Sequence, residues 1–355
     1  MTMRERMLAV IRGHEHDRVP FVQYSGLAAP DPDIWSLVGR QNMGIIRWSA
    51  VHRLEHPNCR LVSEEFERNG RRGERTWLHT PKGTLVEEKL FEPAFGSAAR
   101  RKHFIEKRED YEAFLAYLRD VIVLPDIERY HCDDRLTGDD GLPMVATVRT
   151  PYQHMWILWV CLEDFALHRV DYPDITEECL SLLADIERRI FRVVRSALDE
   201  VPIPFVDFPD NITAPCIGPA NFRRYCVPLY DELAEMLAER DVPVFVHMDG
   251  DLRPLWEAIG ASKVRGLDSL SPPPDNDTSA GNAAAMWPLM RLFVNFPSSV
   301  HLAEPVTVYE EAGRILSEAG HTGRLQIQVS ENVPPGRWRM SFPEIVRAIR
   351  DFGKP

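Results

Sequence analysis

The sequence lacks the features that mark several common classes of protein. Its six cysteines show neither a CxxC pair nor paired spacing, so they indicate no disulfide framework and no zinc ribbon. The longest apolar run, residues 155–162, is far too short to cross a membrane. Charges at residues 4, 5, 6 and 12 leave the N-terminus without the apolar core of a signal peptide. We therefore expect a cytoplasmic protein with reduced thiols and no membrane partner.

A surplus of positive charge is also missing. The 355 residues include 42 Lys and Arg against 54 Asp and Glu, which gives a formal net charge of −12. Nucleic-acid binding needs clustered basic residues. The one basic cluster, Arg68 with residues 71–75, has glycine and glutamate between its arginines and lies on a predicted hairpin, which is typical of a solvated turn. We expect no nucleic-acid partner.

The order of the predicted elements favours one architecture. Residues 60–91 show partial alternation with turn signals at Asn69-Gly70 and Lys82-Gly83, which predicts a small antiparallel meander. From about residue 108, helices alternate with short apolar strands, as in a parallel sheet covered by helices. The predicted helices include one over about 152–170 and one over 305–319. The predicted strands are 19–24, 143–148, 204–208, 243–247, 265–269, 292–296 and 325–330.

Two folds have this alternation of strands and helices, a doubly wound sheet and an eight-stranded barrel. No glycine-rich phosphate loop follows any predicted strand, so the usual reason for a nucleotide-binding sheet is missing. We therefore predict an α/β protein with a (β/α)8 TIM barrel. It would form a single domain over residues 1–355, with the small N-terminal β-hairpin or meander at 60–91 as an insertion.

In such a barrel the active site lies at the C-terminal ends of the strands. His247 and Asp249 stand two residues apart at a strand end, so their side chains would point to the same side. Together with Glu331, which follows the last strand, or with Asp210, they could form a three-ligand metal site with an open coordination position. These nitrogen and oxygen donors suit zinc, manganese or iron. The alternative is a His–Asp pair that only orders the loop.

Other polar residues after strands are candidates for catalysis or substrate binding. Asp207 and Asp210 are close in sequence, and two neighbouring carboxylates raise the pKa of one of them, so Asp210 is a candidate acid or base. Arg149 could hold a carboxylate or phosphate, with Tyr152 as a further catalytic candidate. An ordinary ion pair and a packing residue are the alternatives for these two. The candidates for substrate binding are Asn211, Asn295, Asn332 and Arg337.

Four segments resemble the uroporphyrinogen decarboxylase superfamily. They are the opening RERMLAVIRGHEHDRVP (4–20), the turn 80–84, the stretch 161–165 and the strand end 244–251. The resemblance covers nearly the whole chain and implies a (β/α)8 barrel, commonly a homodimer. The superfamily contains cofactor-independent decarboxylases of uroporphyrinogen. It also contains methyltransferases that move methyl groups between corrinoid proteins and small thiols or methylated substrates, with zinc held by a His-x-Cys pair and a later cysteine.

The sequence differs from both branches at defined positions. Residues 22–27 (VQYSGL) contain no arginine, where the decarboxylases carry an arginine-rich segment. His247 matches the ligand histidine of the methyltransferases, but Asp249 and Glu331 stand where cysteines are expected. We therefore predict metal-assisted methyl transfer or demethylation of an oxygen- or nitrogen-methylated small molecule, with a divalent metal (zinc suspected) and a corrinoid protein as partner.

Two other functions remain open at the level of sequence. One is a cofactor-independent decarboxylase, a lyase that acts on a tetrapyrrole-like or other carboxylated substrate through Arg149, Asp210 and Tyr152. The other is a binding protein that kept the barrel and lost catalysis.

Overall fold

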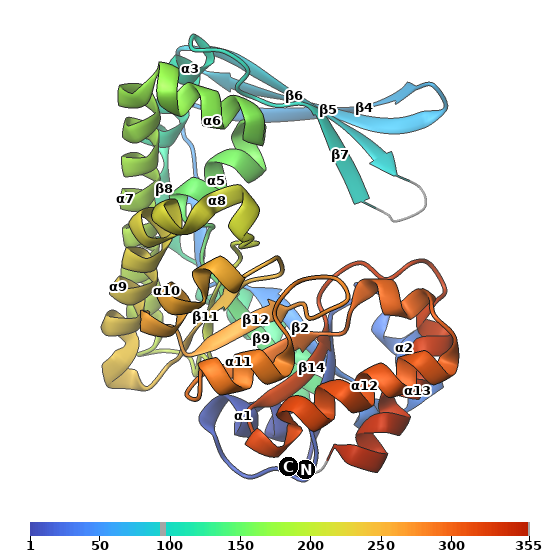
Figure 1. Cartoon of the computed structure of the whole chain (residues 1–355). Helices are drawn as coiled ribbons and strands as arrows, with labels where there is room; N and C mark the ends of the chain where they lie inside the picture. The colour runs from blue at the N-terminus through green and yellow to red at the C-terminus, as the bar shows by residue number, and fades with distance from the viewer. Residues whose placement is uncertain (93–96, 354–355) are drawn as a thin grey trace. The chain divides into compact units, whose positions relative to one another are not determined.

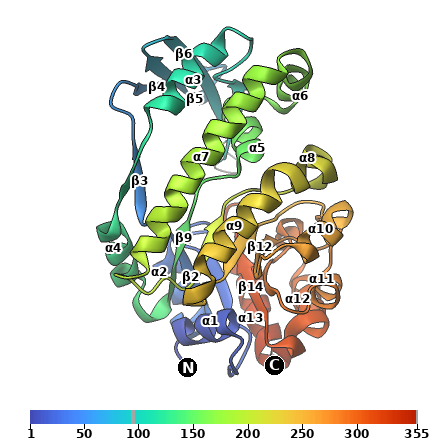
Figure 2. The same ribbon diagram turned by 90° about the vertical axis from the view of Figure 1, so that its left-hand side faces the viewer.

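The computed structural model describes residues 1–92 and 97–353 (Figures 1 and 2). The chain divides into two compact units. The first contains residues 1–51, 126–147 and 195 to the C-terminus, and the second contains residues 52–125 and 148–194. The single domain expected from the sequence stays a prediction, because a division by compactness does not test whether each unit folds independently.

The first unit is a closed barrel of eight parallel strands with helices between them, which confirms the predicted (β/α)8 fold. The order around the ring is β1-β14-β13-β12-β11-β10-β9-β2, and the ring closes where β1 pairs with β14. The sequence analysis did not predict β2. The strands are β1 (Phe21–Tyr24), β2 (Gly44–Ser49), β9 (Gly141–Ala146), β10 (Val206–Phe208), β11 (Val244–His247), β12 (Gly266–Leu270), β13 (Arg291–Asn295) and β14 (Leu325–Val329).

Helices surround these strands. Capping residues mark the ends of α1, and the buried residues of α12 lie on one face. Helix α1 begins with a capping box, in which Thr2 and Glu5 bond each other's backbone N–H groups, and it ends at Gly13 in the left-handed conformation. The predicted helix over 305–319 is confirmed as α12, with its buried residues on one face. The helices are α1 (Met3–Arg12), α2 (Asp31–Val38), α4 (Ile127–Thr137), α8 (Ala214–Asn221), α9 (Val227–Leu237), α10 (Trp256–Ala261), α11 (Ala280–Met286), α12 (Pro305–Ala319) and α13 (Trp338–Phe352).

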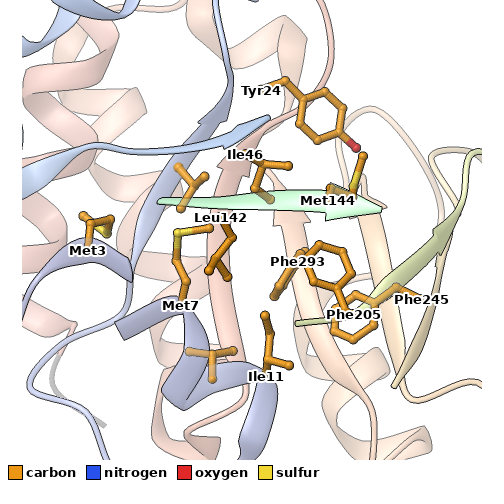
Figure 3. Close-up of a cluster of buried hydrophobic side chains, with 12 residues drawn as sticks. Met3, Met7, Ile11, Tyr24, Ile46, Leu142, Met144, Phe205, Phe245 and Phe293 are labelled. Atoms are coloured by element: carbon orange, nitrogen blue, oxygen red, sulfur yellow. The ribbon is translucent and has the colours of Figure 1, made fainter. Parts of the chain in front are cut away.

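The interior of the barrel has an apolar layer at one end and a polar layer at the other. Side chains two residues apart on a strand point to the same side. The buried pairs Phe205–Asp207, Phe245–His247 and Phe293–Asn295 therefore each place an aromatic ring below a polar group. Helix α1 covers the aromatic end, and Figure 3 shows its Met7 and Ile11 on one side of this cluster. The polar groups thus gather at the C-terminal ends of the strands.

The second unit consists of two antiparallel sheets and several helices. The predicted meander at 60–91 is present as β4 (Arg60–Arg68), β5 (Arg71–Thr80) and β6 (Gly83–Glu92), and the sheet continues into β7 (Ser97–Lys102). Asn69 and Gly70 form the first turn with positive φ angles of 53° and 72°. The remaining elements are β3 (His52–Glu55), β8 (Ile122–Pro125), α3 (Asp110–Asp120), α5 (Pro151–His154), α6 (Leu162–Asp171) and most of α7 (Pro173–Ala197).

None of the helices in the described ranges is both long enough and apolar enough to cross a membrane.

Candidate metal centre

The three residues predicted as metal ligands lie together at the polar end of the barrel. His247 ends β11, Asp249 follows in the next loop, and Glu331 follows β14, with one ligand atom of each residue within 4.8 Å of the others. The Nε2 atom of His247 is 3.2 Å from Oε1 of Glu331 and 3.8 Å from Oδ2 of Asp249. Ligand atoms of a tetrahedral zinc ion with bonds of about 2.1 Å are roughly 3.4 Å apart. The separations therefore suit a single ion.

The three side chains differ in burial, and the cluster is open to solvent on one side. The side chain of His247 is 6% exposed, that of Asp249 is 21% exposed and that of Glu331 is 33% exposed. A ligand can therefore approach from the side of the two carboxylates, while the imidazole lies in the barrel wall. A catalytic zinc site needs such an arrangement, three protein ligands and an accessible fourth position.

A buried carboxylate fixes the orientation of the imidazole. The Nδ1 atom of His247 is 2.9 Å from Oδ2 of Asp268, a residue with no exposed surface, and 3.1 Å from the hydroxyl of Tyr24. Tyr24 also donates a hydrogen bond to Asp268, and Gln328 donates to its other oxygen at 2.8 Å. Because a carboxylate only accepts, Nδ1 carries a hydrogen, and Nε2, which faces Glu331, is the nitrogen that would bind a metal in exchange for its own proton. Metal-binding histidines are usually held in this way.

The electrostatics of the cluster favour a cation. Burial lowers the pKa of His247, but hydrogen bonds to Asp268 and Glu331 outweigh it and place the pKa well above its usual value. Burial raises the pKa of Asp249, the positive charge of His247 lowers it, and the charge of Glu331 raises it again. Burial and the charge of Asp268 raise the pKa of Tyr24, which therefore remains a hydrogen-bond donor. Three carboxylates thus surround one imidazole.

The chain holds Asp249 in place through two asparagines. Asn211, whose φ of +54° is left-handed, donates from its amide to Oδ2 of Asp249 at 2.7 Å. Asn276 donates to the backbone oxygen of Asp249 at 2.7 Å. The next residue is Gly250, where an added Cβ would lie 2.2 Å from the Cβ of Thr213, so only glycine fits this close approach.

Glu331 is held by a second set of contacts. Ser269, with φ of +60°, donates its hydroxyl to Oε1 of Glu331 at 3.1 Å and lies 2.7 Å from the hydroxyl of Ser330. The side-chain oxygen of Asn295 accepts from the backbone N–H of Ser330 at 3.0 Å and of Glu331 at 3.3 Å. Both carboxylates of the cluster are therefore positioned by the protein itself.

The structure gives the other predicted residues of the first unit different surroundings. Of the predicted substrate-binding residues, Asn211 contacts Asp249, and Asn295 is 1% exposed and holds the backbone before Glu331. Asn332 and Arg337 are exposed in the segment between β14 and α13. Asp207 and Asp210 have no exposed surface, and Tyr230 donates a hydrogen bond to Asp210. Glu331, and not Asp210, joins His247 and Asp249 in the cluster.

Arg149 and Tyr152 belong to the second unit. The ring of Tyr152 is buried in α5, packs edge-on against Phe165 at 5.1 Å and lies beneath the guanidinium of Arg169. Burial and the charge of Arg149 lower the pKa of His154 to about 4. A catalytic role of Arg149, Tyr152 or Asp210 stays a prediction.

The sequence analysis assigned no role to the groups that orient the residues of the cluster, namely Tyr24, Asp268, Ser269 and Gln328. Asp268 and Ser269 close a predicted strand, so their position was a signal. Tyr24 lies in an apolar strand and gave none. In β14 the sequence LQIQV alternates glutamine with aliphatic residues, which was a sign that two amides point into the barrel.

Comparisons with known proteins identify the fold. No protein-family model and no curated protein sequence matches the chain. Among solved structures, a methyltransferase from Methanosarcina mazei is similar over 99% of both chains, with a TM-score of 0.57 and 14% sequence identity. Dispersin B is similar over 65% of this chain and 78% of its own, with 12% identity and a TM-score of 0.29, which is too low to support any argument. The chain thus shares its barrel fold with a methyltransferase.

Proposed function

We propose that this protein is a metal-dependent enzyme that transfers a methyl group from an oxygen- or nitrogen-methylated small molecule. The observation that carries the proposal is the cluster of His247, Asp249 and Glu331, in which Asp268 fixes the imidazole with Nε2 toward the two carboxylates. The fold shared with a methyltransferase and the resemblance to the uroporphyrinogen decarboxylase superfamily support methyl transfer as the reaction.

The donor set supports a divalent metal. Without a cation, burial raises the pKa of Asp249 and the negative charge of Glu331 raises it further, against the opposing effect of His247. A nitrogen and two oxygens suit zinc, manganese or iron, and zinc commonly takes three protein ligands at catalytic sites. The cluster contains no cysteine. These harder donors favour an oxygen or nitrogen leaving group over a thiolate.

The residues of the chain would position the substrate and hold charge. A divalent metal held by the cluster would act as a Lewis acid on the oxygen or nitrogen that leaves when the methyl group is transferred. That atom keeps the electron pair of the bond to carbon, and the methyl group passes to the acceptor. For the acceptor we propose a corrinoid protein, the partner that the superfamily resemblance implies. Asn332 and Arg337 are exposed beside Glu331 in the sequence and are our candidates for contact with the substrate.

Metal analysis tests the proposal. The wild-type protein, purified after growth with zinc, manganese and iron, should contain stoichiometric metal by inductively coupled plasma mass spectrometry. His247→Ala and Glu331→Gln should lose it, whereas His14→Ala, which removes an exposed imidazole, should retain it. A wild-type protein that contains no metal and binds none of the three ions in calorimetric titration would overturn the proposal. Loss of methyl groups from a panel of methoxylated and N-methylated compounds, followed by mass spectrometry with a corrinoid acceptor, tests the reaction class.

A further inference from the structure

The N-terminal ends of three neighbouring barrel strands carry a row of arginines. Arg265 precedes β12, Arg291 begins β13 and Arg324 precedes β14. Backbone hydrogen bonds of 2.9 Å join Arg291 N–H to the oxygen of Arg265, and Leu292 N–H to the oxygen of Arg324. Neighbouring strands are about 4.8 Å apart. A chain of net charge −12 therefore concentrates positive charge at the end of the barrel opposite the metal cluster.

A cavity lies at this end. Its volume is about 830 Å³, and Arg12, Arg265 and Arg291 line it together with the segment 201–204 that leads into β10. All of these residues belong to the first unit. Small-molecule sites usually have volumes of roughly 300–1,000 Å³. The cavity therefore has room for more than a single ion.

Two other basic residues of the cavity wall already have acidic partners. Lys263 forms an ion pair with Glu235, and Arg240 forms one with Asp199. Both pairs are exposed and would contribute little to binding or to stability. The charged groups of the wall that remain are the three arginines and one carboxylate, that of Asp241.

Within the described residues, neither Arg12, Arg265 nor Arg291 forms an ion pair with a carboxylate. Arg291 donates from Nε to the backbone oxygen of Ile11 and from Nη1 to that of Leu289, both at 2.8 Å. Burial lowers the pKa of Arg291; the charge of Asp241 raises it and the charge of Arg265 lowers it again. An anion placed between the two guanidinium groups would offset their repulsion.

We propose that this cavity binds a small phosphorylated molecule, whose phosphate contacts Arg265 and Arg291 and, at its edge, Arg12. The planar fork of a guanidinium group matches the oxygens of a phosphate and can form two parallel hydrogen bonds with it. The volume beyond the phosphate accommodates the organic part of the ligand. The site lies at the opposite end of the strands from His247, so it is independent of the function proposed above.

Calorimetric titration of the full-length protein with inorganic pyrophosphate tests this site. The protein is first treated with EDTA to remove metal, and ionic strength is matched with chloride. Arg12→Gln and Arg265→Gln should each weaken binding about tenfold. Arg347→Gln, which removes an exposed arginine of α13, and His247→Ala should leave binding unchanged. Because Arg12 and Arg265 are exposed, their variants should keep the wild-type melting temperature without ligand.

Three results would overturn the proposal. The first is that pyrophosphate does not bind to the wild-type protein. The second is unchanged binding in the Arg12→Gln/Arg265→Gln double variant. The third is an equal loss in Arg347→Gln, because attraction to any positive charge would then account for the binding.

Discussion

His247 and Asp268 are direct partners in the register between β11 and β12, and the Nδ1 atom of His247 lies 2.9 Å from Oδ2 of Asp268. The hydrogen bond that orients the imidazole is therefore built into the pairing of two barrel strands. A slip of one residue would turn one of the two side chains away from the barrel interior. The geometry of the cluster consequently depends on strand register more than on loop conformation.

Replacement of Asp268 should weaken metal binding without removing a ligand. Asp268→Asn replaces the charged acceptor of the Nδ1 hydrogen with a neutral amide, which can also present its NH2 group, so the imidazole is held less firmly in this orientation. We expect a loss of roughly 10- to 100-fold in metal affinity, measured by calorimetric titration. Asp277→Asn is the matched control, because Asp277 accepts hydrogen bonds from the backbone of Leu252 and Arg253 at the same end of the barrel. Equal affinity in Asp268→Asn and the wild type would contradict the orienting role.

Two buried tyrosines offer a matched pair of variants. Tyr24 donates a hydrogen bond to Asp268, and Tyr230 donates one to Asp210. Removal of either hydroxyl leaves a buried carboxylate with one donor fewer, so Tyr24→Phe and Tyr230→Phe should each lower the free energy of unfolding by about 1–3 kcal/mol. Only Tyr24→Phe should also lower metal affinity, because only Tyr24 contacts the Asp268–His247 pair. Chemical denaturation and metal titration of both variants separate the two effects, and a loss of affinity in both would show a general effect of destabilisation.

The left-handed conformation of Ser269 predicts different outcomes for two small substitutions. Such a conformation costs about 1–2 kcal/mol for a residue with a Cβ, and glycine avoids this cost. Ser269→Gly should therefore change the free energy of unfolding little, since relief of strain offsets the lost hydrogen bonds, whereas Ser269→Ala should lower it. Both should lower metal affinity, because both remove the hydroxyl that donates to Glu331. Asn69→Gly, at a comparable φ in the turn of the second unit, should leave metal affinity unchanged.

The stability of the protein in acid should depend on His301. This side chain has no exposed surface, lies 2.7 Å from the hydroxyl of Ser341, and burial lowers its pKa to about 3. The unfolded chain takes up a proton near pH 6.5 and the folded chain does not, so stability falls as the pH drops from 6.5 toward 3. At pH 5 this loss amounts to about 2 kcal/mol.

The variant His301→Asn tests this dependence. It keeps a polar group near the position of Nδ1 but cannot titrate, so the free energy of unfolding should fall less between pH 7 and pH 5 than in the wild type. His14→Asn serves as the control, because the imidazole of His14 is exposed in the folded chain. Parallel pH profiles for the wild type and His301→Asn would contradict the assignment.

Much of the fold could be predicted, because helices and barrel strands differ in the spacing of their apolar residues. Strand β2 was missed, since its apolar pair Ile45-Ile46 is short and is followed by Arg47 and the exposed Trp48. A single helix predicted over about 152–170 is interrupted in the structure. Residues 155–159 form a π-helical turn, with Val160 N–H bonded to the oxygen of Met155, before α6 begins. Apolar spacing does not distinguish such a turn from an α-helix.

The three residues of the candidate cluster could be picked out from the sequence for a simple reason, whereas the residues that hold them in place could not. His247 and Asp249 share one strand end, and Glu331 follows the last strand, so position alone made them candidates. The contact of Tyr24 with His247 joins strands on different sides of the barrel. The contact of Asp268 with His247 depends on the register between β11 and β12, which cannot be read from the sequence. Partners of this kind become visible only when the strands are paired.

The closure of the ring has a consequence for the order in which the protein matures. Strands β1 and β14 pair through Phe21 and Ile327. One edge of β1 therefore has no partner strand until β14 has been synthesised. Tyr24 stands at the end of β1 and Glu331 follows β14. Contacts between such distant segments form late, because a long loop must close first. Completion of the metal cluster and completion of the barrel would then be a single event, which would leave a partly synthesised chain without a formed metal-binding site.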